Sequence, residues 1–246
     1  MGRAQDIYGP DVSLVHHRSG SAHAARCAPG ILALLSDVHA RNGLVLELGC
    51  GSGPLTRELI AAGHRVIATD ASAAMVALAS EHVGRGAEDV RQLKLGVDAV
   101  PAADAIVAVG HPLNYLANAD EIDAALIAIA RALRPGGIVA MDICDLGWGR
   151  GDLTPLGRVG DDWAIIVEFT MPAPDRFDRD ITTFLPNQDG TWRRSDEHHT
   201  SALVDTARIP PMLATHGVEA VVADSFGGEL LPAGLCAVIG RRAGAG

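Results

Sequence analysis

Short apolar runs alternate with amphipathic stretches along the first part of the chain. Five runs have the length and composition of buried parallel strands, and they span 44–46, 65–69, 90–95, 105–110 and 138–143. The stretches between them favour helices over 56–62, from a cap at Ser72 towards Gly84, and over 120–133 with Asp120 as the predicted cap. Strands that alternate with helices predict an α/β fold with a largely parallel sheet.

A glycine-rich turn follows the first predicted strand. Glu47, Gly49, Gly51 and Gly53 occupy alternate positions in it, and Asp70 follows the second predicted strand. Alternate glycines allow backbone conformations that a Cβ would hinder, and they let a ligand approach the main chain closely. The free N–H groups that open the next helix favour a polar or anionic group, and a carboxylate after the second strand suits a ribose diol. The stretch therefore predicts a nucleotide site.

The spacing E-x-G-x-G-x-G resembles the first motif of the class I S-adenosylmethionine-dependent methyltransferases of the small-molecule type. The resemblance implies S-adenosylmethionine as cofactor and S-adenosylhomocysteine as product, with Glu47 and the glycines at the methionine end and Asp70 at the ribose. The cofactor set predicted in this way is Glu47, Gly49, Cys50, Gly51, Gly53, Asp70, Ala71, Val97, Asp98 and Gly110. An NAD site is disfavoured, because Pro54 stands where the third glycine of a dinucleotide motif would fall.

The resemblance also implies a fold. We expect a Rossmann-like seven-stranded methyltransferase sheet, mostly parallel with a reversed last strand, with helices on both faces and an antiparallel β insertion after strand 5. The sequence L-R-P-G-G at 133–137, before the fifth predicted strand, resembles the same family. One domain is expected over 1–246. Its expected parts are an N-terminal helical lid (1–43), a cofactor-binding core (44–145), a β insertion that caps the acceptor (146–203), and a closing helix with a β hairpin (204–246).

Outside the core the pattern changes. Residues 1–20 look irregular, and 22–40 show helical spacing broken near Pro29 and Gly30. In the insertion, 145–160 is typical of a loop, and three strands are predicted over 163–170, 176–185 and 191–202, with a hairpin turn at 187–190. The last elements are a helix over 205–216, which Pro210 and Pro211 must bend or shorten, and two strands over 218–226 and 235–241. The three predicted strands of the insertion hold five of the nine aromatic residues, which line either an acceptor site or the core.

The loop after the fourth strand is the first place to look for catalysis, because ligands lie at the carboxyl ends of parallel strands. His111 is the leading candidate for a general base, and its alternative role is a backbone hydrogen bond beside a turn at Pro112. The other candidate catalytic residues are Asp145, Glu197 and His199. The candidate substrate-binding residues are Tyr8, His16, His111, Asn114, Tyr115 and Trp148.

Composition narrows the expected partners. The net charge of −10 disfavours a nucleic-acid partner, because neutralising phosphates needs clustered Lys and Arg. The four cysteines follow no zinc or disulfide spacing, and the residues of 196–199 would alternate between the faces of a strand, so we expect no metal. No apolar run reaches membrane-spanning length and the first residues lack a signal-peptide core. We therefore expect a cytoplasmic monomer or homodimer without a membrane partner.

Three functions remain open from the sequence. The favoured one is a methyltransferase (EC 2.1.1 class) that methylates O, N or C of a small-molecule acceptor, with specialised metabolism as a hypothesis. The second is a protein that holds S-adenosylmethionine without methyl transfer, such as a repurposed cyclase or an assembly subunit. The third is a methyltransferase of protein or RNA, which would need a basic or extended docking surface that the sequence does not indicate.

Overall fold

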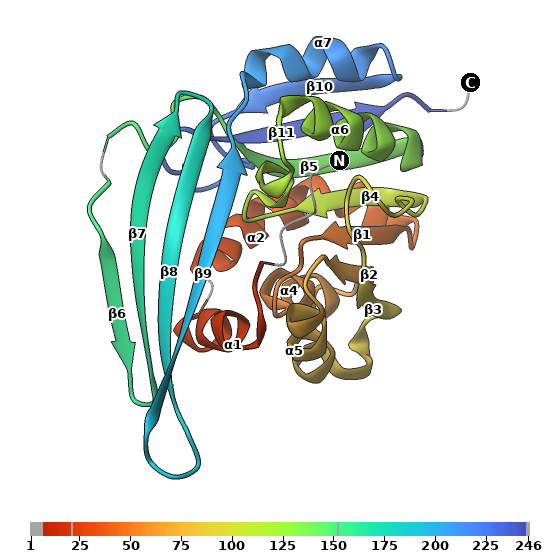
Figure 1. Ribbon diagram of the computed structural model, residues 1–246. Coiled ribbons are helices and arrows are strands. Elements are labelled where there is room, and N and C mark those ends of the chain that lie inside the picture. The colour runs from red at the N-terminus through yellow and green to blue at the C-terminus, as the bar shows by residue number, and fades with distance from the viewer. Residues whose placement is uncertain (1–6, 21, 152, 245–246) are drawn as a thin grey trace.

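Two β-sheets of different construction frame the molecule (Figure 1). The structure, a computed structural model, describes residues 7–20, 22–151 and 153–244. The larger sheet has seven strands in the order β10-β11-β5-β4-β1-β2-β3, and the smaller has four in the order β6-β7-β8-β9. The strands of the larger sheet are β1 (Leu44–Leu48), β2 (Arg65–Asp70), β3 (Asp89–Gln92), β4 (Ala103–Ala108), β5 (Leu133–Cys144), β10 (Val218–Ala223) and β11 (Leu235–Arg242). Those of the smaller sheet are β6 (Leu156–Gly160), β7 (Trp163–Ala173), β8 (Arg176–Pro186) and β9 (Trp192–Ala202).

The seven-stranded sheet confirms the predicted fold class. Strands β3, β2, β1, β4 and β5 pair in parallel with their neighbours, and β11 runs antiparallel to both β5 and β10. The chain passes from β1 outwards to β2 and β3, and then returns to place β4 on the other side of β1. In an open parallel sheet, ligands bind beside the strand ends where the order reverses in this way. The fold thus directs attention to the carboxyl ends of β1 and β4.

Helices cover both faces of this sheet, as expected. The helices are α1 (Pro10–Ser19), α2 (Ala22–Leu34), α3 (Ser36–Ala40), α4 (Pro54–Ala61), α5 (Ala73–Val83), α6 (Ala119–Ala132) and α7 (Ile209–Ala214). On one face α6 and α7 pack against Leu46 and Ile106, and on the other α2 and α4 pack against Val45 and Val107. Successive residues of a strand point to opposite faces, so a run buried throughout is what two helix layers require. None of the described helices is long and apolar enough to cross a membrane.

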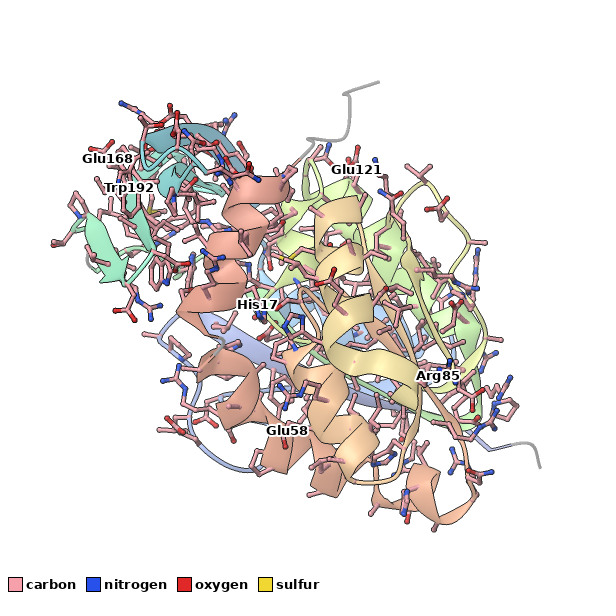
Figure 2. The ribbon with its side chains drawn as sticks, turned by 90° about the horizontal axis from the view of Figure 1, so that it is seen from below. His17, Glu58, Arg85, Glu121, Glu168 and Trp192 are labelled. Atoms are coloured by element: carbon pink, nitrogen blue, oxygen red, sulfur yellow. The ribbon has the colours of Figure 1, made fainter. Side chains whose placement is uncertain are left out.

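The antiparallel sheet stands beside the larger sheet, and α1 lies between it and α4 and α5 (Figure 1). In Figure 2, Glu168 and Trp192 mark the antiparallel sheet, Glu58 marks α4, and α1 with His17 runs between them. The predicted hairpin turn joins β8 to β9, where the N–H of Gly190 donates to the carbonyl oxygen of Asn187 at 3.1 Å. The prediction of a loop over 145–160 is wrong at its C-terminal end, because β6 pairs with β7 from Leu156 to Gly160. Its residues are mostly exposed, so no buried pattern indicated a strand.

Three further local predictions need correction. Residues 10–19, expected to be irregular, form α1, which begins with Pro10 at a position that suits proline. The break expected near Pro29 falls at Leu35, between α2 and α3. The cap of α6 is Asn118, whose side chain accepts from the N–H of Glu121 at 3.0 Å, so Asp120 lies in the first turn instead. The last helix is shortened to α7, as predicted, because Pro210 and Pro211 occupy its first turn.

Candidate active site

One large cavity opens at the carboxyl ends of the parallel strands, between the two sheets. Its volume is about 1230 Å³, and the glycine turn after β1, the end of β2, the loop after β4, the N-terminal segment and β8 all contribute to its wall. Typical sites for one small ligand occupy ~300–1,000 Å³. This cavity therefore has room for more than one small ligand.

The glycine turn presents bare backbone to the cavity. Gly51 has φ +55°, and no heavy atom lies within 4 Å of the place that its Cβ would occupy. Gly49 has φ +70°, and its Cβ would lie 2.5 Å from the Cβ of Pro112. A side chain at Gly49 would therefore push the loop after β4 away, whereas one at Gly51 would project into open space. This is the cradle that a ligand approaching the main chain requires.

Glu47 is buried at the base of this turn. The hydroxyl of Thr56, in the first turn of α4, donates to its Oε2 at 2.6 Å. Burial raises the pKa of the Glu47 carboxyl to about 7; the bond from Thr56 opposes the shift and the nearby Asp70 adds to it. Its charge is therefore easily changed near neutral pH, and a cationic group in the cavity would favour the ionised form.

Asp70, at the end of β2, ties the turn to the start of α5. Its carboxylate accepts from the N–H of Gly51 at 2.9 Å and from that of Ser72 at 2.8 Å. Burial raises the pKa of this carboxyl, while the backbone N–H groups counter the shift. Asp70 lines the cavity, as the predicted ribose contact needs.

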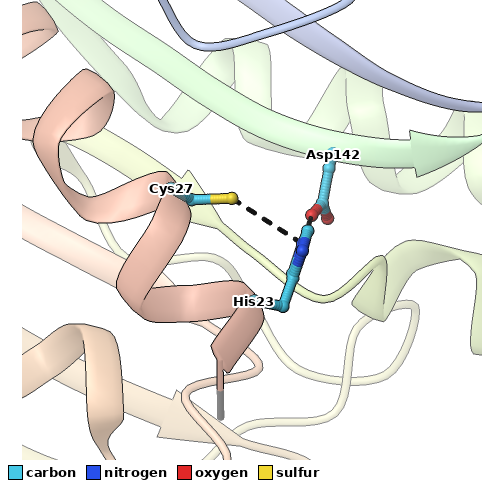
Figure 3. Close-up of side chains that lie close together, drawn as sticks. All are labelled: His23, Cys27 and Asp142. Carbon is cyan, nitrogen blue, oxygen red and sulfur yellow. Dashed lines mark hydrogen bonds and ion pairs between the residues drawn. The ribbon is translucent and has the colours of Figure 1, made fainter. Parts of the chain in front are cut away.

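A buried carboxylate that the sequence analysis missed holds the loop after β4. Asp142 of β5 accepts from the N–H of Gly110 at 3.0 Å and from that of His111 at 2.5 Å. It also accepts from Nε2 of His23 at 2.6 Å, and this bond is the main reason why the pKa of His23 rises to about 10 (Figure 3). His111 is held at φ +49°, a conformation uncommon for residues other than glycine. Asp142 thus positions the loop that carries His111.

Among the described residues, His23, Cys27 and Asp142 form one group of three metal-ligand types that are close enough to hold an ion. Their ligand atoms lie within 4.8 Å of one another, and His23 and Cys27 point from successive turns of α2 towards Asp142 (Figure 3). The His23 Nε2 atom that would face an ion already donates to Asp142, and both Asp142 oxygens accept N–H groups. The contacts describe a hydrogen-bonded ion pair. At 196–199, Asp196 pairs with Arg194 and His198 with Asp180, while Glu197 contacts His199.

Aromatic and basic side chains gather at the antiparallel-sheet side of the cavity. The hydroxyls of Tyr8 and Tyr115 lie 2.8 Å apart, and Arg179 of β8 donates to the Tyr115 hydroxyl. The ring of His111 stacks on Tyr115 with centroids 5.8 Å apart and lies 5.9 Å from Trp148. Burial, reinforced by the charge of Arg179, lowers the pKa of both His111 and His16 to about 4. Both imidazoles are therefore neutral at neutral pH.

Most of the predicted site residues line the cavity, but some of them do not. The predicted residues in the lining are Tyr8, His16, Glu47, Gly49, Cys50, Gly51, Asp70, Ala71, Val97, Gly110, His111, Tyr115 and Trp148. Those outside the lining are Gly53, Asp98, Asn114, Asp145, Glu197 and His199.

Hydrogen bonds explain why four of the outlying polar side chains face elsewhere. Asn114 bonds the N–H and carbonyl of Cys144, and Asp145 accepts from Thr206. Asp98 accepts from the N–H of Lys94. Glu197 accepts from the N–H of Tyr8 and contacts His199, which is fully buried.

Comparison with known proteins places this architecture in a family. A family profile described as a methyltransferase domain matches residues 45–137. Cypemycin N-terminal methyltransferase from Streptomyces sp is 30% identical over 215 residues, which cover 81% of this chain and 83% of that protein. The chain belongs to the class I S-adenosylmethionine-dependent methyltransferases. This methyltransferase therefore uses S-adenosylmethionine as its cofactor.

Other relatives of the methyltransferase match it in part of the sequence or in fold. Malonyl-[acyl-carrier protein] O-methyltransferase from Pectobacterium atrosepticum is 37% identical over 108 residues, but these cover only 44% of this chain and 41% of that protein. The solved sugar N-methyltransferase KedS8 from Streptoalloteichus sp superposes with a TM-score of 0.76 at 18% identity, covering 99% of this chain and 98% of that one. The amino pentose methyltransferase CalS10 from Micromonospora echinaspora, solved with S-adenosylmethionine bound, gives 0.69 at 20% identity, covering 97% and 99%.

Proposed function

We propose that this methyltransferase transfers a methyl group to the nitrogen of a small amine, which enters the part of the cavity lined by Tyr8, Tyr115, His111 and Trp148. The observation that carries the proposal is one continuous cavity of about 1230 Å³, lined by both the glycine turn and β8 of the antiparallel sheet. In this proposal the 44–145 core holds the cofactor, the antiparallel insertion caps the acceptor, and residues 7–43 cover the site.

The bare backbone at Gly49 and Gly51, with Glu47 beneath it, suits the amino acid part of the cofactor, and Asp70 suits the ribose hydroxyls. When bound, S-adenosylmethionine supplies a methyl group on a positively charged sulfur, so the protein has chiefly to align the partners and exclude water. The rings of Tyr8, Tyr115 and Trp148 present aromatic surface that favours positive charge on the reacting groups.

Nitrogen is proposed over oxygen and carbon because of His111. With a pKa lowered to about 4, its imidazole is neutral at neutral pH but accepts a proton only weakly. A hydroxyl or carbon acid needs a stronger base, whereas an amine that arrives unprotonated attacks with its own lone pair. His111 then orients the amine by hydrogen bonding. The names of two relatives support the same choice, since KedS8 is a sugar N-methyltransferase and the cypemycin relative is an N-terminal methyltransferase.

The test is an assay of the purified protein with methyl-labelled S-adenosylmethionine and a panel of small primary amines, each matched with the alcohol of the same skeleton. We expect label on nitrogen in some amines and little on the alcohols. Label only on alcohols would contradict the choice of nitrogen. Label only on bulk protein or tRNA would overturn the small-molecule acceptor, and cofactor binding without label on any acceptor would favour a protein that does not transfer methyl groups.

A further inference from the structure

Arg179 projects from β8 into the wall of the cavity. Its guanidinium lies 5.2 Å from the centre of the Tyr115 ring and donates to the Tyr115 hydroxyl. Its Nε atom is buried and has no hydrogen-bond partner among the described residues. A buried N–H group without a partner costs stability unless something else satisfies it, and in a ligand cavity the natural partner is the ligand.

No ion pair between described residues includes Arg179. The other arginines that line the cavity do have acidic partners: Arg176 pairs with Asp178 at 2.9 Å, and Arg26 approaches Glu229 at 3.7 Å.

The carboxylates of Asp142 and Glu197 are already engaged elsewhere. Asp142 accepts from two main-chain N–H groups and from His23. Glu197 accepts from the N–H groups of Tyr8 and Gly9 and contacts His199. Their ion-pair partners are His23 and His199, and neither carboxylate forms an ion pair with Arg179.

The charge of Arg179 also shapes its surroundings. It contributes, after burial, to the low pKa of His16 and His111, so these two rings are neutral. Arg179 is thereby left as a cation among neutral aromatic and imidazole side chains. Burying a charge without a counter-charge is costly, so the arrangement makes sense where a bound molecule brings the negative charge.

We infer that the acceptor carries a carboxylate, and that Arg179 binds it beside Tyr115. This inference rests on the proposed function, since it specifies the acceptor of the same cavity. A carboxylate is favoured over a phosphate because Arg179 offers one planar guanidinium with its Nε–H free, which matches two coplanar oxygens and one negative charge. A phosphate dianion would call for a second cation without an acidic partner. A small amino acid, or a larger amine with a carboxylate at a similar distance, fits this description.

The inference can be tested without methyl transfer. The probes are benzoate and its neutral analogue benzamide, titrated calorimetrically into protein that has been saturated with S-adenosylhomocysteine. We expect benzoate to bind the unmodified protein ~10- to 100-fold more tightly than benzamide, as for a charge-assisted hydrogen bond. Arg179→Gln should remove this preference, and Arg179→Lys should retain part of it. Arg194→Gln is the matched control, because Arg194 lies on β9, is exposed and pairs with Asp196.

Two results would overturn the inference. The first is equal binding of benzoate and benzamide, or no binding of either. The second is an Arg179→Gln variant that loses affinity for S-adenosylhomocysteine, which would mean that the guanidinium holds the carboxylate of the cofactor instead. Both readouts are independent of turnover, so a failure of the amine panel and a failure of this inference are distinguishable. If the amine panel yields substrates, Arg179→Gln should lower kcat/KM for acceptors with a carboxylate and spare their amides.

Discussion

Glu197 holds the main chain of Tyr8, 189 residues earlier in the sequence: its Oε2 accepts the N–H of Tyr8 at 2.8 Å. Its other oxygen accepts the N–H of Gly9 at 2.9 Å. The carbonyl of Tyr8 in turn accepts from the hydroxyl of Ser72 at 2.6 Å, beside Asp70. The main chain of Tyr8 therefore ties the N-terminal segment to two places: its N–H binds the antiparallel sheet, and its carbonyl binds the edge of the candidate cofactor site. Glu197, a candidate catalytic residue by sequence, has a positioning role in this geometry.

Glu197→Gln should loosen this segment. One of the two carboxylate oxygens becomes an NH₂ group that cannot accept, so an N–H group is left unsatisfied at a cost of about 1–3 kcal/mol. We expect faster proteolysis within 7–20 and weaker binding of S-adenosylmethionine, measured by timed digestion with mass spectrometry and by calorimetry. Glu168→Gln, at an exposed position on β7 (Figure 2), is the control. Unchanged cleavage in this segment would show that other contacts hold it.

Asp70→Asn should weaken cofactor binding and preserve the fold. The amide keeps the shape and one oxygen, but it loses the negative charge and one of the acceptors that now serve Gly51, Ser72 and the cavity. Losing a hydrogen bond to a charged group predicts an affinity for S-adenosylhomocysteine that is about tenfold lower or more. Calorimetric titration measures this directly. Glu58→Gln on the exposed side of α4 (Figure 2) should bind as the unmodified protein does, and equal affinity in both variants would remove Asp70 from the site.

Glu47 should make stability fall as pH rises towards neutrality. Its folded-state pKa is raised from 4.5 to about 7, so the native state holds the proton over that interval more tightly than the unfolded chain does. The protonated Glu47 side chain therefore stabilises the native state fully below about pH 4.5, and this stabilisation is lost as the pH rises through about 7. The loss is on the order of 3 kcal/mol for a fully buried group.

Urea unfolding at several pH values across this interval measures the effect. The Glu47→Gln variant can still accept from Thr56. Its free energy of unfolding should increase relative to that of the unmodified protein as pH rises through this interval, and the difference should then stay constant above it. Curves that stay parallel throughout would mean that Glu47 titrates normally.

The sequence predicted the parts of the candidate site that depend on local spacing. The glycine turn, Glu47 and Asp70 follow directly from residues near one another in the chain, and His111 follows from the rule that ligands lie at the ends of parallel strands. Asp142 and His23 could not be found in this way, since 119 residues separate them and neither belongs to a motif.

The antiparallel insertion was the harder part to interpret. Three of its four strands were recognisable, but which strand residues enter the cavity depends on how the two sheets pack. Arg179 lines the cavity, whereas Glu197, on the neighbouring strand, lies outside the lining and binds the N-terminal segment.

For α1 the sequence did contain a signal. Pro10 followed by Asp11 is typical of a helix start, although the helix has only a weak apolar face.

His23→Gln should act on both stability and the loop after β4. The folded-state pKa of His23 is raised from 6.5 to about 10, chiefly by its bond to Asp142, so its imidazolium stabilises the native state fully below about 6.5. This stabilisation is lost as pH rises through about 10, a higher pH than the one at which Glu47 loses its proton. The stability of the unmodified protein should therefore exceed that of the variant at pH 6 and approach it near pH 10, by urea unfolding at each of ~four pH values.

Measuring kcat of the His23→Gln variant tells whether the ion pair between His23 and Asp142 supports catalysis or only stability. Without the imidazolium, Asp142 keeps only the N–H groups of Gly110 and His111, and the loop that carries His111 loses its outer support. We expect kcat to fall by about tenfold, with little change in the affinity for S-adenosylhomocysteine, because small misplacements of an aligning group are costly to rate. Cys27→Ser is the matched control, since Cys27 contacts the same Nε2 only at 3.8 Å. An equal fall in kcat for both variants would assign the effect to packing of α2 instead of to the bond between His23 and Asp142.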